Sequence, residues 1–339
     1  MRKIEGDLCH TNISKNLKPI LSFDENRDFN EWKKQIREKF LELTGVKRVE
    51  ENAVPLKVEV EEEVQCEGYK RIRFVFESEK DAFVPCYLLI PDTKKEKYPV
   101  AITLQGHSSG FHNSVGIIKE ESDAEYASDR GRFAVQAVEQ GFIGLAIEQR
   151  AMGERATTRH TFGGMMCTFQ AMTAIMLGRT VLAERMFDVS RAIDALKEFP
   201  QCDLDNIIIT GNSGGGTMSY YATCYDERIK ATVPSCAFCP YENSIMDIYH
   251  CACNYIPSAN LWFEMQDLSC LIAPRKLHLV SGTQDTIFPF TGVEKGFETV
   301  KKIYQKAGAK DNCALYPTPK GHWWCKDIVW GAVKETGVK

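Results

Sequence analysis

The sequence predicts an α/β fold with a mostly parallel central sheet, and three observations support this. After residue 91, short apolar stretches alternate with helical patterns, as expected for parallel strands that are buried on both faces. Residues 56–90 instead alternate apolar and polar side chains, which is typical of antiparallel strands with one exposed face. A glycine-rich turn at 211–216 joins one of the apolar stretches to a helical segment. We therefore expect antiparallel strands that lead into a parallel sheet.

The first 55 residues are predicted to form a helical extension. Between Phe29 and Leu43, apolar residues recur at steps of three and four, the pattern of an amphipathic helix. Asp24 or Asp28 is suited to cap the start of this helix, and Gly45 is suited to end it.

The remaining residues, 56–339, are predicted to form the main domain, with insertions near 150–185 and 238–272. The expected buried strands are Val100–Leu104, Phe142–Ile147, Asn206–Thr210, Ala231–Pro234, Lys276–Val280 and Asn312–Tyr316. The expected helices include Arg132–Gln140, Met186–Phe199, Gly214–Cys224 and Gly292–Ala307. Helices between successive strands should cover both faces of the sheet.

The composition excludes several classes of protein. The 339 residues carry 42 Lys and Arg against 46 Asp and Glu, a net charge of −4, which argues against a nucleic-acid binder. With 44% hydrophobic and 26% charged residues, the chain is expected to fold into a packed structure. No apolar stretch reaches the roughly 18 residues that a membrane span needs, and the charged start does not resemble a signal peptide. We therefore expect a cytoplasmic protein that binds no membrane.

The 13 cysteines are unusually numerous. An odd number in a chain without a secretion signal indicates reduced thiols, most of them buried as small apolar side chains. Cys236 and Cys239, followed by Cys251 and Cys253, can also be interpreted as metal ligands or a redox pair. Their spacing is not that of a common zinc motif, and in a strand Cys251 and Cys253 would point to opposite faces. We expect no metal.

The most informative motif is Gly211-Asn-Ser213-Gly-Gly215, which fits G-x-S-x-G. It lies between an apolar strand and a helix, where a nucleophilic serine must protrude from a sharp turn with small neighbours. The alternative is a turn that cradles a phosphate. No lysine follows the glycines, however, so the phosphate-binding pattern fails. The motif therefore indicates Ser213 as a nucleophile.

A nucleophilic serine needs a base and an acid that orients the base. In α/β folds that carry this serine motif, the acid and then the histidine follow the serine in the chain, each in a loop after a strand. Asp285 and His322 satisfy both the order and the position. Weaker candidates are His10, His160, His250, His278, Asp267 and Asp311. The expected triad is Ser213, Asp285 and His322.

Backbone amides are expected to bind the oxyanion. Gly214 N–H follows the nucleophile at the start of a helix. A second donor should come from the loop after Val100–Leu104, where Gly106 allows close approach and the N–H of His107 is the candidate. A structural role for the His107 imidazole is favoured over a catalytic one, because only the amide is needed.

Three further residues are predicted to line the substrate pocket: Trp323, Trp262 and Arg150. Trp323 is adjacent to the proposed base, and Trp262 lies in the second insertion. For Arg150, a structural ion pair, for example with Asp188, is favoured over a catalytic role. The methionines and aromatic residues of the insertions are interpreted mainly as core.

Five segments together resemble a known family. They are Gln105-Gly-His-Ser-Ser-Gly110, Glu148-Gln-Arg-Ala-Met-Gly-Glu-Arg155, Gly211-Asn-Ser-Gly-Gly-Gly216, Gly282-Thr-Gln-Asp285 and Gly321-His-Trp323. They resemble bacterial α/β-hydrolases of the acetyl xylan esterase-like group, which are related to dienelactone hydrolases and cephalosporin-C deacetylases. The resemblance implies the same triad and oxyanion amides. This sequence departs from the family at Ala151, where an Arg-Gly-x-Gly-like turn would have glycine. Its expected nucleophile is also Ser, whereas dienelactone hydrolases use Cys.

From these residues we expect an α/β-hydrolase fold and a serine esterase that works through an acyl-enzyme, without a cofactor. The resemblance implies acetylated sugars as the class of substrate. A peptidase or amidase with the same triad remains an alternative, as does a non-catalytic binding protein with this fold. The expected partner is a small ester, and a homo-oligomer remains open.

Overall fold

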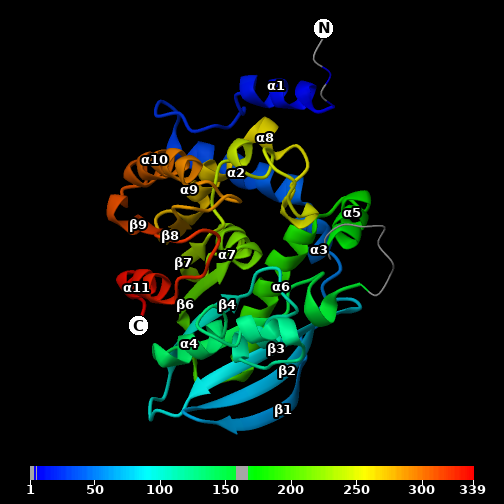
Figure 1. Cartoon of the computed structure of the whole chain (residues 1–339), viewed down its shortest axis with the longest axis vertical. Helices are drawn as coiled ribbons and strands as arrows, with labels where there is room; N and C mark the ends of the chain where they lie inside the picture. Colours follow the sequence, from blue (N-terminus) through cyan, green and yellow to red (C-terminus); the bar gives the residue numbers. More distant parts are fainter. Residues whose placement is uncertain (1–3, 5, 158–166) are drawn as a thin grey trace.

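The computed structural model describes residues 4, 6–157 and 167–339, and within these residues its centre is a nine-stranded sheet (Figure 1). The strands are β1 (Val58–Cys66), β2 (Tyr69–Glu79), β3 (Ala82–Pro91), β4 (Tyr98–Leu104), β5 (Ile143–Ile147), β6 (Cys202–Asn212), β7 (Ile229–Ser235), β8 (Lys276–Gly282) and β9 (Cys313–Thr318). Their order is β1-β2-β3-β5-β4-β6-β7-β8-β9. β1, β2 and β3 pair antiparallel, β3 pairs antiparallel with β5, and the strands from β5 to β9 are parallel. The predicted fold class is confirmed.

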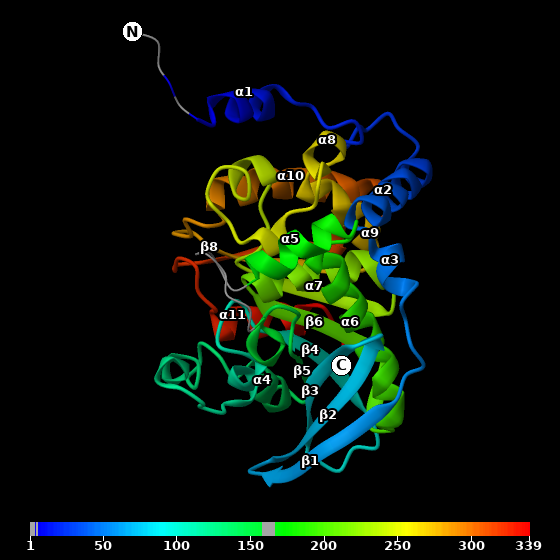
Figure 2. The ribbon, with the colours of Figure 1, turned by 90° about the vertical axis from the view of Figure 1, so that its right-hand side faces the viewer.

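Helices cover both faces of this sheet. They are α1 (Leu8–Asn16), α2 (Phe29–Thr44), α3 (Val46–Glu50), α4 (Phe133–Glu139), α5 (Thr168–Met176), α6 (Val181–Ala195), α7 (Gly214–Tyr225), α8 (Ala259–Trp262), α9 (Ser269–Ile272), α10 (Phe290–Lys306) and α11 (Lys326–Glu335). Figure 2 shows α4 and α6 on opposite sides of the sheet. Successive strand residues point to opposite faces, so Ile207 and Ile209 join the larger core and Ile208 joins the core beneath α11.

The amphipathic segment near the N-terminus forms α2 as its pattern predicts. Asp28 caps the helix by accepting a hydrogen bond from Glu31 N at 2.9 Å, and Gly45 ends it in the left-handed conformation. Trp32, Ile36 and Phe40 are buried on one face of the helix. The ring of Phe40 stacks on Tyr221 of α7 at 6.0 Å. The extension is therefore packed against the helix that begins beside Ser213.

The second insertion folds into short helical turns that include α8 and α9. The first contains α5, and part of it, with His160, lies outside the described residues. Among the residues that the structure describes, no helix has the length and apolar character needed to cross a membrane.

Candidate active site

Ser213 occupies a strained turn between β6 and α7. Its φ of 54° and ψ of −124° lie in a region that residues other than glycine rarely adopt. The turn is tight because a Cβ atom at Gly211 or at Gly215 would overlap the carbonyl oxygen of Leu104 on β4. These contacts explain why the motif needs glycine at both positions, and they present the serine at the N-terminus of α7.

The loops after β8 and β9 bring Asp285 and His322 together. His322 Nδ1 lies 2.9 Å from Asp285 Oδ2. The other carboxylate oxygen accepts hydrogen bonds from the backbone N–H groups of Ile287 at 2.8 Å and Phe288 at 3.1 Å. The buried carboxylate is thus fixed by its own loop. It favours the His322 tautomer that carries its proton on Nδ1 and leaves Nε2 free to accept one.

His322 is also held from its other sides. The Phe288 ring stacks parallel to the imidazole with the centroids 5.9 Å apart. Beneath the loop, the Cys236 thiol donates to Trp323 O at 3.5 Å and lies 3.8 Å from Gly321 O. Burial raises the pKa of Cys236 to about 12, so this thiol is protonated near neutral pH. We conclude that Cys236 supports the histidine loop as a neutral donor.

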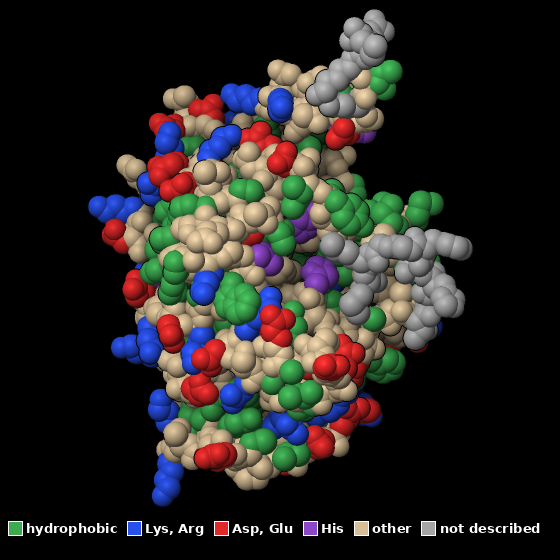
Figure 3. Space-filling view, viewed as in Figure 1, with side chains coloured by type: hydrophobic (Ala, Val, Ile, Leu, Met, Phe, Trp, Pro, Cys, Tyr) green, Lys and Arg blue, Asp and Glu red, His purple; other side chains and the backbone are tan. Residues whose placement is uncertain are grey.

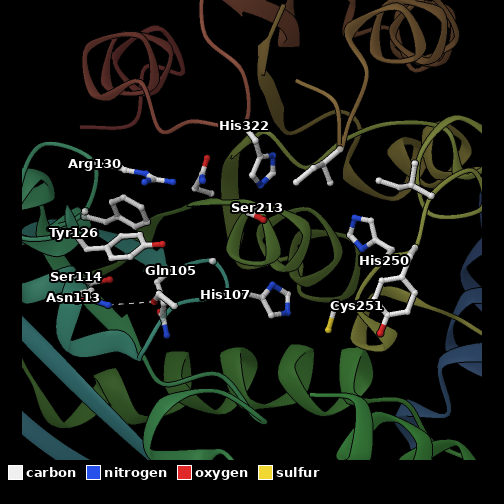
Figure 4. A pocket seen from close by; sticks show the side chains of 18 residues that line it. Gln105, His107, Asn113, Ser114, Tyr126, Arg130, Ser213, His250, Cys251 and His322 are labelled. Carbon is white, nitrogen blue, oxygen red and sulfur yellow. Dashed lines mark hydrogen bonds between the residues drawn. The ribbon is translucent and has the colours of Figure 1, made fainter. Parts of the chain in front are cut away.

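Ser213 and His322 line the same cavity, which has a volume of about 320 Å³. Figure 3 shows histidine side chains gathered at the centre of one face of the molecule, and Figure 4 shows His322 next to Ser213 in the cavity. The remaining lining includes the polar residues Gln105, Ser108, Asn113, Ser114, Tyr126, Arg130 and Asn212. A serine, a histidine–carboxylate pair and a polar wall therefore share one space.

The loop after β4 passes close to the nucleophile. A Cβ atom at Gly106 would lie 3.0 Å from Asn212 O and 3.1 Å from Ser213 Cβ, so glycine allows this approach. The ring of His107 lies against Gly214, since a Cβ there would be 3.0 Å from its Nδ1. The two residues predicted to supply oxyanion amides are therefore adjacent to each other and to Ser213.

Glu148 connects this loop to the segment after β5. Its carboxylate accepts hydrogen bonds from Gln105 Nε2 at 3.0 Å, Phe111 N at 3.3 Å and Glu154 N at 3.1 Å. Burial raises the pKa of Glu148 to about 7, against the lowering effect of the two backbone donors. The side chain is therefore a buried link between two loops of the site.

The three residues predicted to line the pocket lie outside this cavity, so that interpretation is corrected. Arg150 forms a paired hydrogen bond with Asp188, both contacts at 2.9 Å, because its loop turns toward α6. Trp323 is 38% exposed, and the guanidinium of Arg130 lies 4.1 Å from its ring centroid. The ring of Trp262 lies beneath Lys39 of α2 at 3.9 Å, as part of the packing of the N-terminal extension.

The other candidates from the sequence occupy varied positions. His278 is buried, with its Nδ1 2.8 Å from Ala332 O, and Asp267 accepts a hydrogen bond from Phe23 N at 2.9 Å. His250, a weaker candidate for the base, does line the cavity. Its ring meets Phe288 edge to face at 5.4 Å.

The sequence interpretation missed the wall contributed by residues 108–131. Asn113, Ser114, Tyr126 and Arg130 all line the cavity. The signal was the length of the connection between β4 and α4, since links of more than about 12–15 residues inside a domain are usually functional.

One group of side chains near the cavity has the composition of a metal site. His107 Nε2 and the sulfur atoms of Cys167, Cys251 and Cys253 all lie within 4.8 Å of one another. Burial lowers the pKa of His107, but its hydrogen bonds with Cys167 and Cys253 outweigh this and raise it to about 9. Hydrogen bonds from Cys167 and Cys251 lower the pKa of the Cys253 thiol well below its ordinary value. The alternative grouping of Cys236 and Cys239 with Cys251 and Cys253, which the sequence did not favour, is not formed, because Cys236 lies beside Asp285 and His322.

A strained serine between strand and helix, with a histidine–aspartate pair on the loops that follow later strands, defines the α/β-hydrolase class. The family model described as the abhydrolase family matches residues 5–322, and the chain belongs to this family. The prediction of a hydrolase is thereby confirmed.

Comparisons with individual proteins agree with this class. The provisionally named hydrolase YtaP of Bacillus subtilis (strain 168) is 26% identical over 244 residues, which cover 70% of this chain and 78% of YtaP. A provisionally named acetyl xylan esterase from Bacteroides fragilis has a similar structure, with a TM-score of 0.78, 20% identity, and coverage of 94% of this chain and 82% of its own. A glucuronoyl esterase from Solibacter usitatus gives a TM-score of 0.67 at 15% identity, with 95% and 97% covered. At these identities the structural matches establish the fold.

Proposed function

We propose that the protein is a serine carboxylic-ester hydrolase with Ser213 as nucleophile, His322 as general base and Asp285 as the residue that orients His322. The observation that carries the proposal is the conjunction of two features at one cavity. Ser213 has the strained backbone of an exposed nucleophile, and His322 is held by Asp285 at 2.9 Å. Together these features are requirements for acyl transfer by a serine nucleophile.

In the proposed reaction, Ser213 Oγ attacks the ester carbonyl carbon while His322 Nε2 takes the hydroxyl proton. The amides of His107 and Gly214 bind the oxyanion of the tetrahedral intermediate. The intermediate expels the alcohol, which receives the proton from His322, and an acyl-Ser213 ester remains. Water then attacks this ester, again giving its proton to His322, and the acid leaves as Ser213 regains a proton.

The proposed substrates are acetylated sugars or similar small esters. A cavity of about 320 Å³ has room for a short acyl group and part of an alcohol. The side chains of Asn113, Ser114 and Tyr126 give this cavity hydrogen-bonding groups that suit a hydroxyl-rich alcohol. Solved structures with this fold include proteins described as acetyl xylan esterases, such as that of Thermoanaerobacterium sp. JW/SL YS485.

The test compares 4-nitrophenyl acetate and butyrate hydrolysis by the wild-type protein, Ser213→Ala and the control Ser22→Ala. We expect Ser213→Ala to lose about a thousandfold or more in kcat/KM, because the acyl-enzyme can no longer form. Ser22 lies in the N-terminal extension, so its variant should match the wild type. Equal rates in all three proteins would refute the proposed nucleophile. Cleavage of matched amides in preference to esters would indicate a peptidase or amidase instead.

A further inference from the structure

Four side chains from three distant segments converge beside the candidate active site. His107 comes from the loop after β4, Cys167 precedes α5, and Cys251 precedes the single turn Ala252–Asn254, which contains Cys253. We call these four residues the thiol–imidazole cluster. All three cysteines are buried, with exposed fractions of 0%, 2% and 4%. In Figure 4 the His107 ring lies near the Cys251 sulfur at one side of the cavity.

The spacing within the cluster is close to that of ligands around one metal ion. Cys167 Sγ lies 3.3 Å from both Cys251 Sγ and His107 Nε2. Cys253 Sγ lies 3.3 Å from Cys251 Sγ and 3.4 Å from His107 Nε2. In a tetrahedral zinc site, bonds of about 2.3 Å to sulfur and 2.0 Å to nitrogen put the ligand atoms about 3.5–3.8 Å apart. The four contacts given above therefore lie within about half an ångström of the zinc spacing, and the other two pairs of ligand atoms lie within 4.8 Å.

We propose that the thiol–imidazole cluster is a structural zinc(II) site. Three thiolates and an imidazole are a soft donor set that favours zinc, and four protein ligands fill a tetrahedral shell with no open position for water or substrate. Binding releases to solvent the protons on the thiols and on His107 Nε2, and it leaves zinc in the same oxidation state. This inference replaces the expectation from the sequence that the chain binds no metal.

The surroundings of the cluster balance its charge and keep water out. Three thiolates and one neutral imidazole around Zn²⁺ carry a net charge of −1. Arg185 of α6 is 3% exposed and places Nη2 3.7 Å from Cys167 Sγ. Hydrogen bonds from the guanidinium to Arg150 O, at 2.6 and 2.9 Å, fix it there. Buried Ala151, Met152, Ala171, Ala174 and Val181 form an apolar shell with the cysteines.

A disulfide explains this arrangement less well than a metal. A disulfide needs two sulfurs about 2.05 Å apart, and it would leave the third thiol and the imidazole without a function. A second group, Cys236 with Asp285 and His322, has ligand atoms equally close together. Those groups already have partners within the candidate active site, because His322 bonds to Asp285 and Cys236 to a backbone carbonyl. The three thiols and the imidazole, brought together from distant segments, therefore make the thiol–imidazole cluster the better candidate for the zinc site.

A zinc ion here would tie together three segments of the chain, two of which line the cavity. His107 would be bound through Nε2, while the rest of its ring lies against Gly214, the other proposed donor of the oxyanion site. Cys251 also lines the cavity. The metal would thus position the oxyanion loop without contacting substrate. Zinc binding does not depend on the proposed esterase activity, and the two ideas can fail separately.

The test is the metal content of the full-length protein, purified without chelator from cells grown with added zinc. Inductively coupled plasma mass spectrometry should find about one zinc per chain in the wild type. Cys167→Ser and Cys253→Ser should each lose at least about fivefold of that zinc. The matched control is Cys202→Ala, which removes a buried thiol from β6 far from the cluster and should keep the full amount. Circular dichroism shows whether each variant is folded.

A second measurement uses the wild type alone, so it does not depend on how the variants fold. Zinc is removed with a chelator under reducing conditions and Co²⁺ is added. We expect strong visible absorption typical of tetrahedral cobalt, with charge-transfer bands from thiolate. Absence of both bound zinc and these bands would overturn the proposal. Equal zinc in the cluster variants and in Cys202→Ala would overturn it as well, as would a disulfide among the three cysteines in a non-reduced digest.

Discussion

The two sides of the cavity are held in place in different ways. On one side, Ser213, Asp285 and His322 extend from the ends of β6, β8 and β9, and the backbone of the parallel sheet fixes their positions. On the other side, Cys167 and Cys251 belong to the two insertions, which the sheet does not connect, and the loop after β4 brings His107 against them. Their positions depend on contacts between side chains.

This difference predicts that substitutions on the two sides affect different properties of the protein. Replacing a side chain at the end of a strand should remove a chemical step while the fold survives, because the sheet does not depend on that side chain. Replacing a side chain in the opposite wall should loosen loops and lower stability or metal content, with smaller effects on the reaction. The predictions below test this contrast.

The largest effect is expected from Asp285→Asn. The new amide can still accept hydrogen bonds from Ile287 N and Phe288 N, but its NH₂ group would face His322 Nδ1. This favours the imidazole tautomer that cannot take a proton from Ser213, so kcat/KM should fall by about 10³–10⁴-fold. Ester hydrolysis and urea denaturation measure the two consequences. Asp311→Asn, an exposed acid just before β9, is the control, and a similar loss there would contradict the proposed role of Asp285.

The triad side could be predicted from the sequence because each of its signals is local. Gly211 and Gly215 flank the serine in five consecutive residues, and they are needed because Leu104 passes so close to them. Asp285 and His322 each follow an apolar strand, and the parallel topology puts the ends of those strands at one edge. The fold class followed from the same alternation of strands and helices.

The opposite wall could not be predicted in this way, because it depends on contacts between distant segments. Nothing in the spacing of His107, Cys167 and Cys251 indicates that they meet. The expectation that Cys251 and Cys253 point to opposite faces assumed a strand, whereas Cys251 caps a short helical turn that contains Cys253. Arg150 was assigned to the pocket because it follows a strand at the functional edge, but Asp188 draws its side chain toward α6.

The next largest effect is expected from Asp188→Asn, on stability. Burial alone would raise the pKa of Asp188, but Arg150 and Arg155 outweigh burial and hold it well below its usual range. The carboxylate also accepts a hydrogen bond from Ser78 at 2.6 Å. Removing its charge leaves two buried guanidinium groups with less compensation, so the free energy of unfolding should fall by about 3 kcal/mol. Urea denaturation measures this change.

Asp194→Asn is the matched control for Asp188→Asn. Asp194 also accepts from an arginine, Arg228 at 2.7 Å, but its side chain is 25% exposed. Solvent screens this pair, so the loss should be about 1 kcal/mol or less. Equal losses in the two variants would show that the buried ion pairs of Asp188 with Arg150 and Arg155 stabilise the fold no more than the exposed pair of Asp194 does.

A third effect should appear only as a dependence on pH. Burial raises the pKa of Glu148 to about 7, above its ordinary value of 4.5, so the native state keeps this proton to a higher pH than the unfolded state. Between pH 4.5 and 7 the unfolded state therefore binds fewer protons, and the contribution of Glu148 to stability falls as pH rises. Glu148→Gln lacks this loss, so wild-type stability should fall by about 2 kcal/mol relative to the variant from about pH 5 to 7.

Glu154→Gln is the control for the sign of this effect. Hydrogen bonds from Arg73 and Lys119 outweigh partial burial and lower the pKa of Glu154, so its contribution is lost as the pH falls. Its pH dependence should therefore run opposite to that of Glu148→Gln. Denaturation curves from pH 7 down to about pH 3 test both variants, because the change at Glu154 appears only below its ordinary pKa of 4.5. The same slope in both variants would contradict the assigned protonation of Glu148.

The smallest effect is expected from removing zinc at the thiol–imidazole cluster. Without the metal, the His107 loop keeps its links through Gln105 to Glu148 and Gln149, so the oxyanion amide should be displaced rather than lost. We expect kcat for 4-nitrophenyl acetate to fall by about tenfold, the lower end of the range for groups that orient a site, and to recover when zinc is restored. KM should change less, because the oxyanion amide acts mainly on the charge that develops in the transition state. A chelated protein that keeps its full kcat would show that the sheet and the Glu148 link alone hold the oxyanion loop, and the contrast between the two sides of the cavity would then be one of stability only.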